Sequence, residues 1–242
     1  MMRMLLWRGM LAGLVGAFVA ATFALLFAEP NIEAAIALEA HSAMHAAARH
    51  EEIVSRGVQK TWGLYTALGL YGTALGGMMA ILFAAMYGRV ARCGPRSLAL
   101  LLALAAFVIV VLVPGLKYPP TPPAVGLHDT LRLRTAAYFA MLALSIASAT
   151  AALWSYHRLG ARYSGPDRLM MAAGLYVALV ALGQLLLPVI DEVTAEFPAS
   201  LLWQFRLTSI GTQAVFWLVS GDLFGRTAER LIRDQAVQRA RG

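Results

Sequence analysis

The chain has 242 residues, of which 60% are hydrophobic and only 14% are charged, with a formal net charge of +7. This composition is typical of polytopic membrane proteins and excludes a separate soluble catalytic domain, because nearly every residue is needed for apolar segments and short connections. The positive charge does not indicate nucleic-acid binding, since the basic residues are spread over the ends of the apolar segments.

Six apolar stretches predict six transmembrane helices, because each has about the ~20 residues that a helix needs to cross a bilayer. The first runs for too long to be a signal peptide and is followed by Glu29-Pro30 in place of a small-residue cleavage site, so we expect a retained helix. The predicted fold class is all-α: one polytopic membrane helix bundle, a single integral membrane domain over 1–242. The stretches are Met4–Ala28, Trp62–Tyr87, Ser97–Leu116, Thr135–Trp154, Leu169–Ile190 and Pro198–Phe224.

The charges between these stretches predict the orientation of the chain. Thirteen of the twenty Lys and Arg residues, with four acids, lie at the first end and after stretches two, four and six; seven bases and nine acids lie on the other side. Basic loops stay in the cytoplasm, so both termini should be cytoplasmic. This topology gives an extracytoplasmic loop at 29–61, a Pro-rich outer loop at 117–134 and a basic cytoplasmic tail at 225–242.

Local patterns predict how parts of the chain pack and fold. Gly9-x-x-x-Gly13 and Gly72-x-x-x-Gly76 would let two helix backbones approach closely. In the first outer loop, Asn31–Glu52 has a helix-forming composition, and Asn31 after Pro30 is the expected N-cap. The proline-dense segment Tyr118–Pro123 should be an extended polyproline II strand.

The first outer loop also carries the candidate metal ligands. His41 and His45 would lie one turn apart on the predicted helix, and His50, Glu51 and Glu52 precede the second stretch. Imidazole combined with carboxylate suits cobalt, nickel or zinc, whereas oxygen ligands alone would suit magnesium or calcium. The alternative interpretation is a solvated polar helix whose histidines are incidental.

Arg206 marks a second candidate site, because a centred arginine costs roughly 2.5–3.5 kcal/mol on insertion scales. Polar residues follow it on the same helix face, and a shorter polar stripe lies on stretch five. One interpretation is a structural ion pair between Arg206 and an acid at the outer border; the other is an ion pathway through the bundle, and the two are compatible. The residues concerned are Arg206, Ser209, Gln213 and Ser220 on the sixth stretch, with Gln184, Asp191 and Glu192 at or after the fifth.

The sequence lacks the motifs of several other classes. It has no Gly-rich loop ending in Gly-Lys-Ser/Thr, no His-Glu-x-x-His and no Gly-x-Ser-x-Gly. These absences argue against ATP use by this chain and against hydrolysis, and no mid-membrane histidine is placed to bind haem. We therefore expect neither an enzyme nor a prosthetic group, and we assign no role to the single cysteine, Cys93.

Several segments resemble the CbtA family of predicted cobalt transporter subunits of bacteria, over nearly the whole chain. The matching segments are His50–Gln59, Leu116–Gly126, Phe197–Arg206 and the short Asp191-Glu192-Val193, where the family has Asn-Glu-Val. Trp203-Gln204 stands where the family has a more basic pair. The resemblance implies cobalt uptake linked to cobalamin synthesis, beside a small single-span, His-rich partner, CbtB.

These observations together predict a multi-pass subunit in the bacterial inner membrane that captures Co²⁺ at its outer face and passes it inward. The outer His and Glu residues would capture the ion, Asp191 and Glu192 would attract it, and Arg206 would hold those acids. The ion is cargo, and no nucleic acid is expected to bind. The rival hypothesis is a membrane scaffold that does not transport and whose outer acidic and His-containing loops dock a partner protein.

Overall fold

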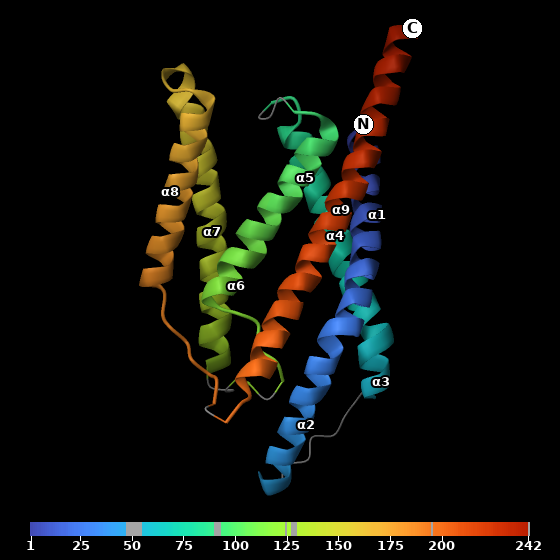
Figure 1. The fold of residues 1–242 in the computed structure, drawn as a ribbon. Helices are drawn as coiled ribbons and strands as arrows, with labels where there is room; N and C mark the ends of the chain where they lie inside the picture. Colours follow the sequence, from blue (N-terminus) through green and yellow to red (C-terminus); the bar gives the residue numbers. More distant parts are fainter. Residues whose placement is uncertain (47–54, 90–92, 124, 127–129, 195, 242) are drawn as a thin grey trace. The chain divides into compact units, whose positions relative to one another are not determined.

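The computed structural model describes residues 1–46, 55–89, 93–123, 125–126, 130–194 and 196–241, and the side chains of 41–46, 161 and 239–241 are outside that description (Figure 1). Every long regular element in these ranges is a helix, which confirms the all-α prediction. The chain divides into two compact units: unit 1 consists of Met1–Phe107 and Ala199–Gly242, and unit 2 of Val108–Pro198. Whether the units act as one domain stays a prediction.

Unit 1 is built around its first helix. The α1 helix contacts α4 along most of its length and α9 on another side, and α5 packs on α9. Figure 1 draws the start of α1 and the end of α9 at one end of this unit, with α2 and α3 at the opposite end. The elements are α1 Met2–Phe23, the π-helical turn η1 Ala24–Ala28, α2 Glu29–Ala46, α3 Arg56–Val58, the π-helical turn η2 Gln59–Gly63, α4 Leu64–Met86, α5 Pro95–Ala106 and α9 Ala199–Arg241.

The two predicted glycine motifs face each other across the α1–α4 contact. A Cβ atom added to Gly13 would lie 2.1 Å from the carbonyl oxygen of Gly72, and one added to Gly9 would lie 2.4 Å from that of Gly76. Backbones this close leave no room for any side chain, so the two helices are in direct van der Waals contact there. The predicted close approach is confirmed.

A second contact of small residues joins α5 to α9. A Cβ atom on Gly221 would lie 2.6 Å from the Cβ of Ala103, and one on Gly225 would lie 3.2 Å from the Cβ of Ala99. Both pairs follow the spacing of four residues that places small side chains on one helix face. This pair of motifs was not predicted from the sequence.

Two helices continue past a proline, and in each of them a π-helical turn comes shortly before that proline. The turn η1 ends two residues before Pro30, and η3, Phe107–Leu112, ends two residues before Pro114. Proline has no N–H, and its ring crowds the carbonyl four residues earlier, which in both helices lies inside the wider turn. The π turn therefore lets each helix continue where an α-helix would be strained.

This continuity corrects the predicted end of the first stretch. The helix does not stop at Glu29-Pro30, and Asn31 is not an N-cap. Asn31 lies inside the helix, where its Nδ2 donates to the carbonyl oxygen of Phe27 at 3.0 Å. The α2 helix is thus the direct extension of α1 beyond the apolar stretch.

Unit 2 is a helical hairpin with a short helix packed against it. Its core is formed by Val113, Tyr118, Ala137 and Met141. The Ser164 hydroxyl caps α8 by accepting from the amide of Asp167 at 3.3 Å. The elements are the remainder of η3, α6 Val113–Lys117, α7 Leu131–Leu159, the 3₁₀ turn η5 Gly160–Arg162 and α8 Gly165–Leu186.

The fifth stretch is shorter than predicted. The α8 helix ends at Leu186 and not at Ile190, because Leu187 takes an extended conformation with ψ 147°. The residue before a proline is driven out of the helical region by its ring, and Pro188 follows here. The segment 187–194 is therefore irregular backbone that leads away from α8.

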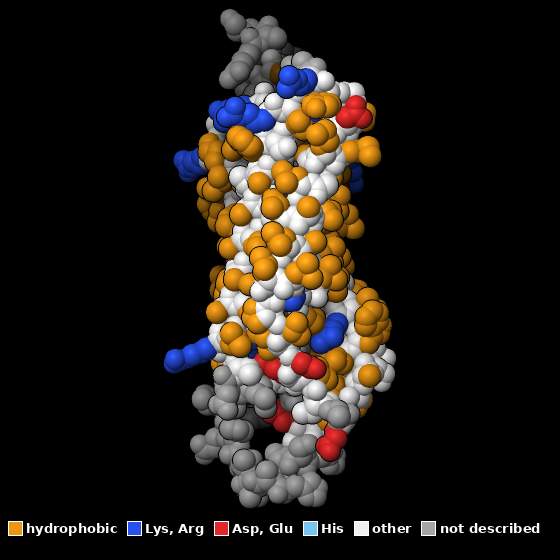
Figure 2. All heavy atoms as spheres, turned by 90° about the vertical axis from the view of Figure 1, so that its left-hand side faces the viewer, with side chains coloured by type: hydrophobic (Ala, Val, Ile, Leu, Met, Phe, Trp, Pro, Cys, Tyr) orange, Lys and Arg blue, Asp and Glu red, His pale blue; other side chains and the backbone are white. Residues whose placement is uncertain are grey.

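Five helical segments of the described chain are long and apolar enough to cross a membrane, which supports a multi-pass membrane protein: Met2–Ala40, Arg56–Met86, Pro95–Lys117, Leu131–Leu159 and Gly165–Leu186. The predicted sixth stretch lies inside the 43-residue α9, which is not among the five, so the count of six stays a prediction. On the face in Figure 2, hydrophobic side chains cover the middle and charged ones gather towards the ends. Leu185 of α8 is 83% exposed, as expected of a lipid contact.

Candidate functional site

The predicted metal ligands lie at the far end of α2 and beyond it. His41 and His45 are one turn apart on α2, as predicted, although their side chains are outside the described part of the structure. His50, Glu51 and Glu52 lie outside the described residues altogether. Among the residues that are described, no group of three His, Cys, Asp or Glu side chains could hold a metal ion. The metal site therefore stays a prediction.

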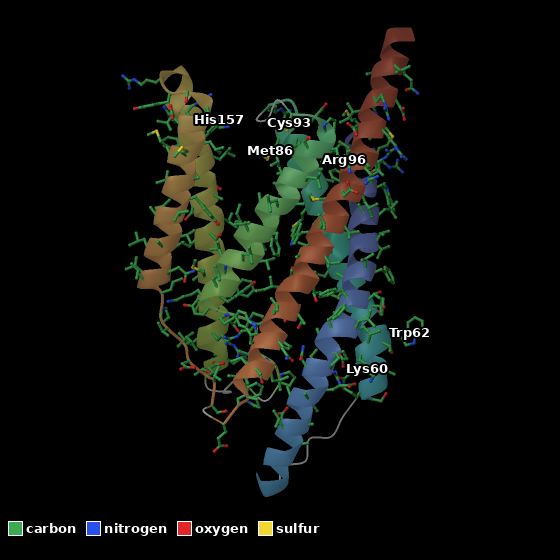
Figure 3. The ribbon with its side chains drawn as sticks, in the orientation of Figure 1. Lys60, Trp62, Met86, Cys93, Arg96 and His157 are labelled. Atoms are coloured by element: carbon green, nitrogen blue, oxygen red, sulfur yellow. The ribbon has the colours of Figure 1, made fainter. Side chains whose placement is uncertain are left out.

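Two ion pairs join α2 to the segment that enters α4. Arg56 donates to the buried carboxylate of Glu29, and Lys60 Nζ lies 2.7 Å from Glu33 Oε1. Trp62, next along η2, is 77% exposed and projects away from the helices of unit 1 (Figure 3). An exposed Trp beside such charges is typical of the membrane–water border. Arg49, Arg56 and Lys60 are the bases near Glu51 and Glu52 in the sequence that could neutralise them instead of a metal, and two of the three, Arg56 and Lys60, already have partners on α2.

Glu192 is the centre of a polar cluster in unit 2. Its side chain is 3% exposed, and its Oε2 lies 2.6 Å from Arg134 Nη1. Thr130 donates its hydroxyl hydrogen to the other carboxylate oxygen. Arg134 also donates to the hydroxyl of Thr121 at 3.3 Å. The pairing of Arg134 with Glu192 was not predicted from the sequence, although Arg134 directly precedes the fourth stretch and Glu192 follows the fifth.

Gly126 makes this cluster sterically possible. Its φ of +124° lies where L side chains rarely occur. A Cβ atom there would lie 2.8 Å from Arg134 Nη1 and 3.2 Å from Glu192 Oε2. The ion pair therefore lies directly against the backbone of the Pro-rich loop.

Further hydrogen bonds fix the end of α8. Lys117 Nζ donates to the carbonyl oxygen of Gln184 at 2.7 Å, and the Gln184 amide donates to the carbonyl of Val113 at 3.5 Å. The Tyr118 hydroxyl donates to the carbonyl of Pro188 at 2.8 Å. Burial raises the pKa of Tyr118 above its ordinary value of 10.0. These bonds give Gln184 a structural role, and its place in a pathway stays a prediction.

Asp191 and Glu192 differ in their surroundings. The Asp191 side chain is exposed, and its Oδ1 accepts from the amide of Val193 at 3.2 Å. Glu192 is buried and paired with Arg134. The predicted pairing of Arg206 with either acid joins the two units and stays a prediction.

The residues of the predicted polar stripe lie on α9, in unit 1, and their role in a pathway stays a prediction. The hydroxyl of Ser209 donates to the carbonyl of Phe205 at 2.7 Å. In the described part of the chain, the stripe also contains four buried polar atoms without a hydrogen-bond partner: Arg206 Nε, Gln213 Oε1, Trp217 Nε1 and Ser220 Oγ. Sequence reasoning missed Trp217, whose offset of eleven residues from Arg206 places it on the same helix face.

At the end of unit 1 where α5 begins, three charged residues of α5 and α9 form a cluster. Arg96 donates to Asp222 Oδ1 from Nε at 3.0 Å and from Nη2 at 2.7 Å, while Arg226 donates to Oδ2 at 2.7 Å. Arg8 donates to the carbonyl oxygen of Thr227 beside it. Figure 3 shows Arg96 at the same end of this unit as Met86 and Cys93. This cluster ties α5 to α9.

No curated protein and no solved structure matches the chain. A family model described as a probable cobalt transporter subunit (CbtA) matches residues 2–229. The match includes all of unit 2, most of unit 1, the ion pairs of α2 and the polar stripe of α9. The chain therefore belongs to the CbtA family of probable cobalt transporter subunits.

Proposed function

We propose that this protein is the membrane subunit of a Co²⁺ uptake transporter in the bacterial inner membrane, linked to cobalamin synthesis. Family membership over residues 2–229 is the observation that carries the proposal. A subunit needs a partner, and the resemblance points to a single-span, His-rich CbtB-like protein. Several apolar helices able to cross a membrane support a protein that moves its ion through a bilayer.

The capture site in this proposal consists of His41, His45, His50, Glu51 and Glu52. Helical spacing on α2 supports it, because His41 and His45 can bind one ion from the same face. A mixed imidazole and carboxylate set suits Co²⁺, and a transported ion needs ligands weak enough to release it. We therefore expect few protein ligands, with water completing the coordination.

The ion pairs of α2 support the availability of the acidic ligands. The structural alternative neutralises Glu51 and Glu52 with Arg49, Arg56 or Lys60. Arg56 is engaged by Glu29, and Lys60 by Glu33. An alternative that uses Arg56 or Lys60 must divide that base between two carboxylates, which weakens both pairs.

The acids after α8 divide into two roles in this proposal. Exposed Asp191 attracts the cation to the mouth, whereas buried Glu192 anchors the Pro-rich loop through Arg134. Arg206 sets the field at the mouth and holds Asp191, and Ser209, Gln213 and Gln184 complete the polar lining. The membrane potential can drive entry, at about 2.3 kcal/mol per charge per 100 mV and twice that for a divalent ion.

Uptake of radioactive cobalt by lipid vesicles tests the proposal. The protein is reconstituted with and without its CbtB-like partner under an imposed inside-negative potential. We expect accumulation that depends on the protein and is lost in His50→Ala/Glu52→Ala. Glu39→Ala is the matched control, because it removes an exposed carboxylate of α2 outside the ligand set.

The same experiment decides between transport and the scaffold hypothesis. A scaffold would bind the partner in the vesicles while moving no cobalt in any combination. Loss of uptake in Glu39→Ala as well as in the double variant would show that the general acidity of the loop matters and not the proposed ligands.

A further inference from the structure

The connection between α7 and α8 carries three arginines and a single acid. Arg158 lies in the last turn of α7, Arg162 ends η5, and Arg168 lies near the start of α8. Arg158 and Arg162 are exposed, and Arg168 is half-buried. With Asp167 as the acid, residues 155–168 have a formal net charge of +2. We call these residues the α7–α8 turn.

Asp167 is already engaged by its own helix. The Ser164 hydroxyl donates to Asp167 Oδ2 at 2.6 Å, and the amide of Asp167 donates to Ser164 Oγ at 3.3 Å. An acid in this position also stabilises the positive end of the helix dipole. None of the ion pairs among the described residues includes Arg158, Arg162 or Arg168. The described part of unit 2 therefore leaves the excess positive charge of the turn without a counter-charge.

Two of these arginines lie over aromatic rings of α7. Arg158 Cζ is 4.9 Å from the centroid of the Trp154 ring, and Arg168 Cζ is 5.0 Å from that of Tyr156. The attraction of a cation to the ring face holds each guanidinium in place. The guanidinium keeps its charge there, and the N–H groups at its edge can still donate to a phosphate group. The rings thus position two groups that can bind an anion.

The charge cluster of unit 1 has the opposite arrangement. Arg96 and Arg226 both bind Asp222, so their charge is used to hold α5 to α9. Positive charge is common at the borders of membrane proteins. The α7–α8 turn is distinct because rings, and not carboxylates, hold its arginines.

Exposed apolar side chains lie at both helix ends that meet the α7–α8 turn. Trp154 ends the fourth predicted stretch and is 61% exposed, whereas Leu169 and Met170 begin the fifth and are 63% and 73% exposed. An exposed tryptophan beside basic residues at the end of an apolar stretch is typical of the headgroup layer of a bilayer. Acyl chains and headgroups therefore meet at this part of the hairpin.

The arginines are distributed around the end of the hairpin. Trp154 and Tyr156 are two residues apart on α7, so their side chains leave the helix about 160° apart. Arg158 and Arg168 follow these two rings and lie on different sides of α7. A layer of lipid headgroups fits this distribution, because it surrounds the helices. An acidic peptide would contact one side only.

We propose that the α7–α8 turn binds the headgroups of anionic phospholipids. Arg158 and Arg168 would donate to phosphate oxygens, and Trp154 would contact the upper part of the acyl chains. The predicted topology places the turn in the cytoplasmic leaflet, whose anionic lipids attract basic residues. Bound lipid would hold the end of the hairpin in the headgroup layer. This site goes beyond the proposed function and does not depend on it.

Native mass spectrometry of the purified full chain in detergent tests the proposal. Phosphatidylglycerol, which is anionic, and phosphatidylcholine, which is zwitterionic, are titrated separately with the same acyl chains. Both lipids contain a phosphate, so the comparison isolates the net charge of the headgroup. We expect phosphatidylglycerol to bind about tenfold more tightly or better, as attraction by two bases requires. Equal affinity for the two lipids would overturn the proposal.

A pair of double variants locates the lipid. Arg158→Gln/Arg168→Gln should lower the affinity for phosphatidylglycerol about tenfold, towards that for phosphatidylcholine. Arg230→Gln/Arg233→Gln is the matched control, because it removes the same charge from exposed positions of α9 and should retain the preference. The same loss in both double variants would show attraction by overall charge and would overturn the assignment to the turn.

Fluorescence quenching by brominated lipids tests the same site with its arginines intact. The protein is placed in nanodiscs with equal amounts of the two lipids, of which one has brominated acyl chains. The difference between wild type and Trp154→Phe gives the contribution of Trp154. We expect brominated phosphatidylglycerol to quench Trp154 several-fold more than brominated phosphatidylcholine does. Equal quenching would contradict the proposal even if the Arg158→Gln/Arg168→Gln protein does not fold.

Trp62 provides the control for this measurement. It is 77% exposed, but Arg56 and Lys60 beside it are already paired with acids of α2. Its contribution, obtained from Trp62→Phe, should show no preference between the lipids, and a preference as large as that of Trp154 would show that the turn is not selective.

A soluble anion is the remaining alternative ligand. Excess inorganic phosphate at matched ionic strength should leave the preference at Trp154 unchanged, because phosphate has no acyl chain. Loss of the preference would identify a soluble anion as the ligand and would overturn the lipid assignment. Neither readout measures cobalt, so the lipid site can fail while the proposed function holds, and the reverse.

Discussion

Arg134 and Glu192 form a partly buried ion pair in unit 2, with 2.6 Å between Nη1 and Oε2. Arg134 lies in the first turn of α7, and Glu192 lies in the irregular segment after α8. The two residues are 58 positions apart, and their pairing fixes the end of the helical hairpin to the Pro-rich loop.

Arg134→Ala should destabilise the protein strongly, because it leaves the Glu192 carboxylate buried without its partner. Breaking such a pair costs about 3 kcal/mol or more. Thermal unfolding in detergent, followed by circular dichroism, measures the change. Arg132→Ala is the control, because Arg132 is exposed two residues earlier on α7 and should change stability by less than about 0.5 kcal/mol. Equal melting temperatures for the two variants would contradict a structural role for the pair.

Gly126→Ala should also destabilise unit 2, by about 1–3 kcal/mol, because the residue has a positive φ and its Cβ would press on Arg134. Gly115→Ala is the matched control, since a Cβ there meets nothing within 4 Å. The same unfolding measurement applies. A Gly126→Ala protein as stable as Gly115→Ala would mean that the loop can move away from the ion pair without loss.

Gly13→Ala should disrupt the α1–α4 contact. The new Cβ would lie 2.1 Å from a backbone oxygen, which cannot move aside as a flexible side chain would, so we expect a loss of about 3 kcal/mol or more. Gly174→Ala on α8 meets open space and should have little effect. Yield of monodisperse protein by gel filtration, with the melting temperature, compares them. Normal folding of Gly13→Ala would show that the two helices can separate.

Co²⁺ should bind the purified protein with weak to moderate affinity and more weakly in His50→Ala/Glu52→Ala. Loss of ligands should reduce the affinity about tenfold or more. Histidine binds metal only when neutral and has a reference pKa near 6.5, so protonation competes with the metal and affinity should fall below about pH 6. Isothermal titration at pH 7.5 and pH 5.5 measures both effects. Equal affinity of wild type and double variant would place the site elsewhere, most plainly on the partner subunit.

Both termini should be cytoplasmic, with the end of α2 outside. Single cysteines at Ala46 and Val237, in a Cys93→Ser background, can be labelled with a membrane-impermeant reagent in intact cells. We expect Ala46→Cys to react from outside and Val237→Cys to react only after lysis. Reaction of Ala46→Cys only after lysis would reverse the predicted topology.

The sequence determined the properties that depend on local pattern. Apolar runs and their charged borders predicted the helical elements and the membrane class. A helix in a bilayer must form all its backbone hydrogen bonds internally and must be long enough to cross the hydrocarbon core. The pairing of the two Gly-x-x-x-Gly motifs could also be anticipated, since only small residues permit so close a contact. Family membership was evident from short segments spread over the chain.

The tertiary structure alone decided which distant groups meet. Nothing in the local sequence indicates that Glu192 meets Arg134, which is 58 positions away, because pairing depends on how the helices are arranged in space. Pro30 looked like a terminator, yet a π turn carries the helix through it because a wider turn makes room for the proline ring. Trp217 is likewise buried only because α9 packs against both α1 and α5. This packing places its indole N–H among the buried polar groups of the stripe on α9.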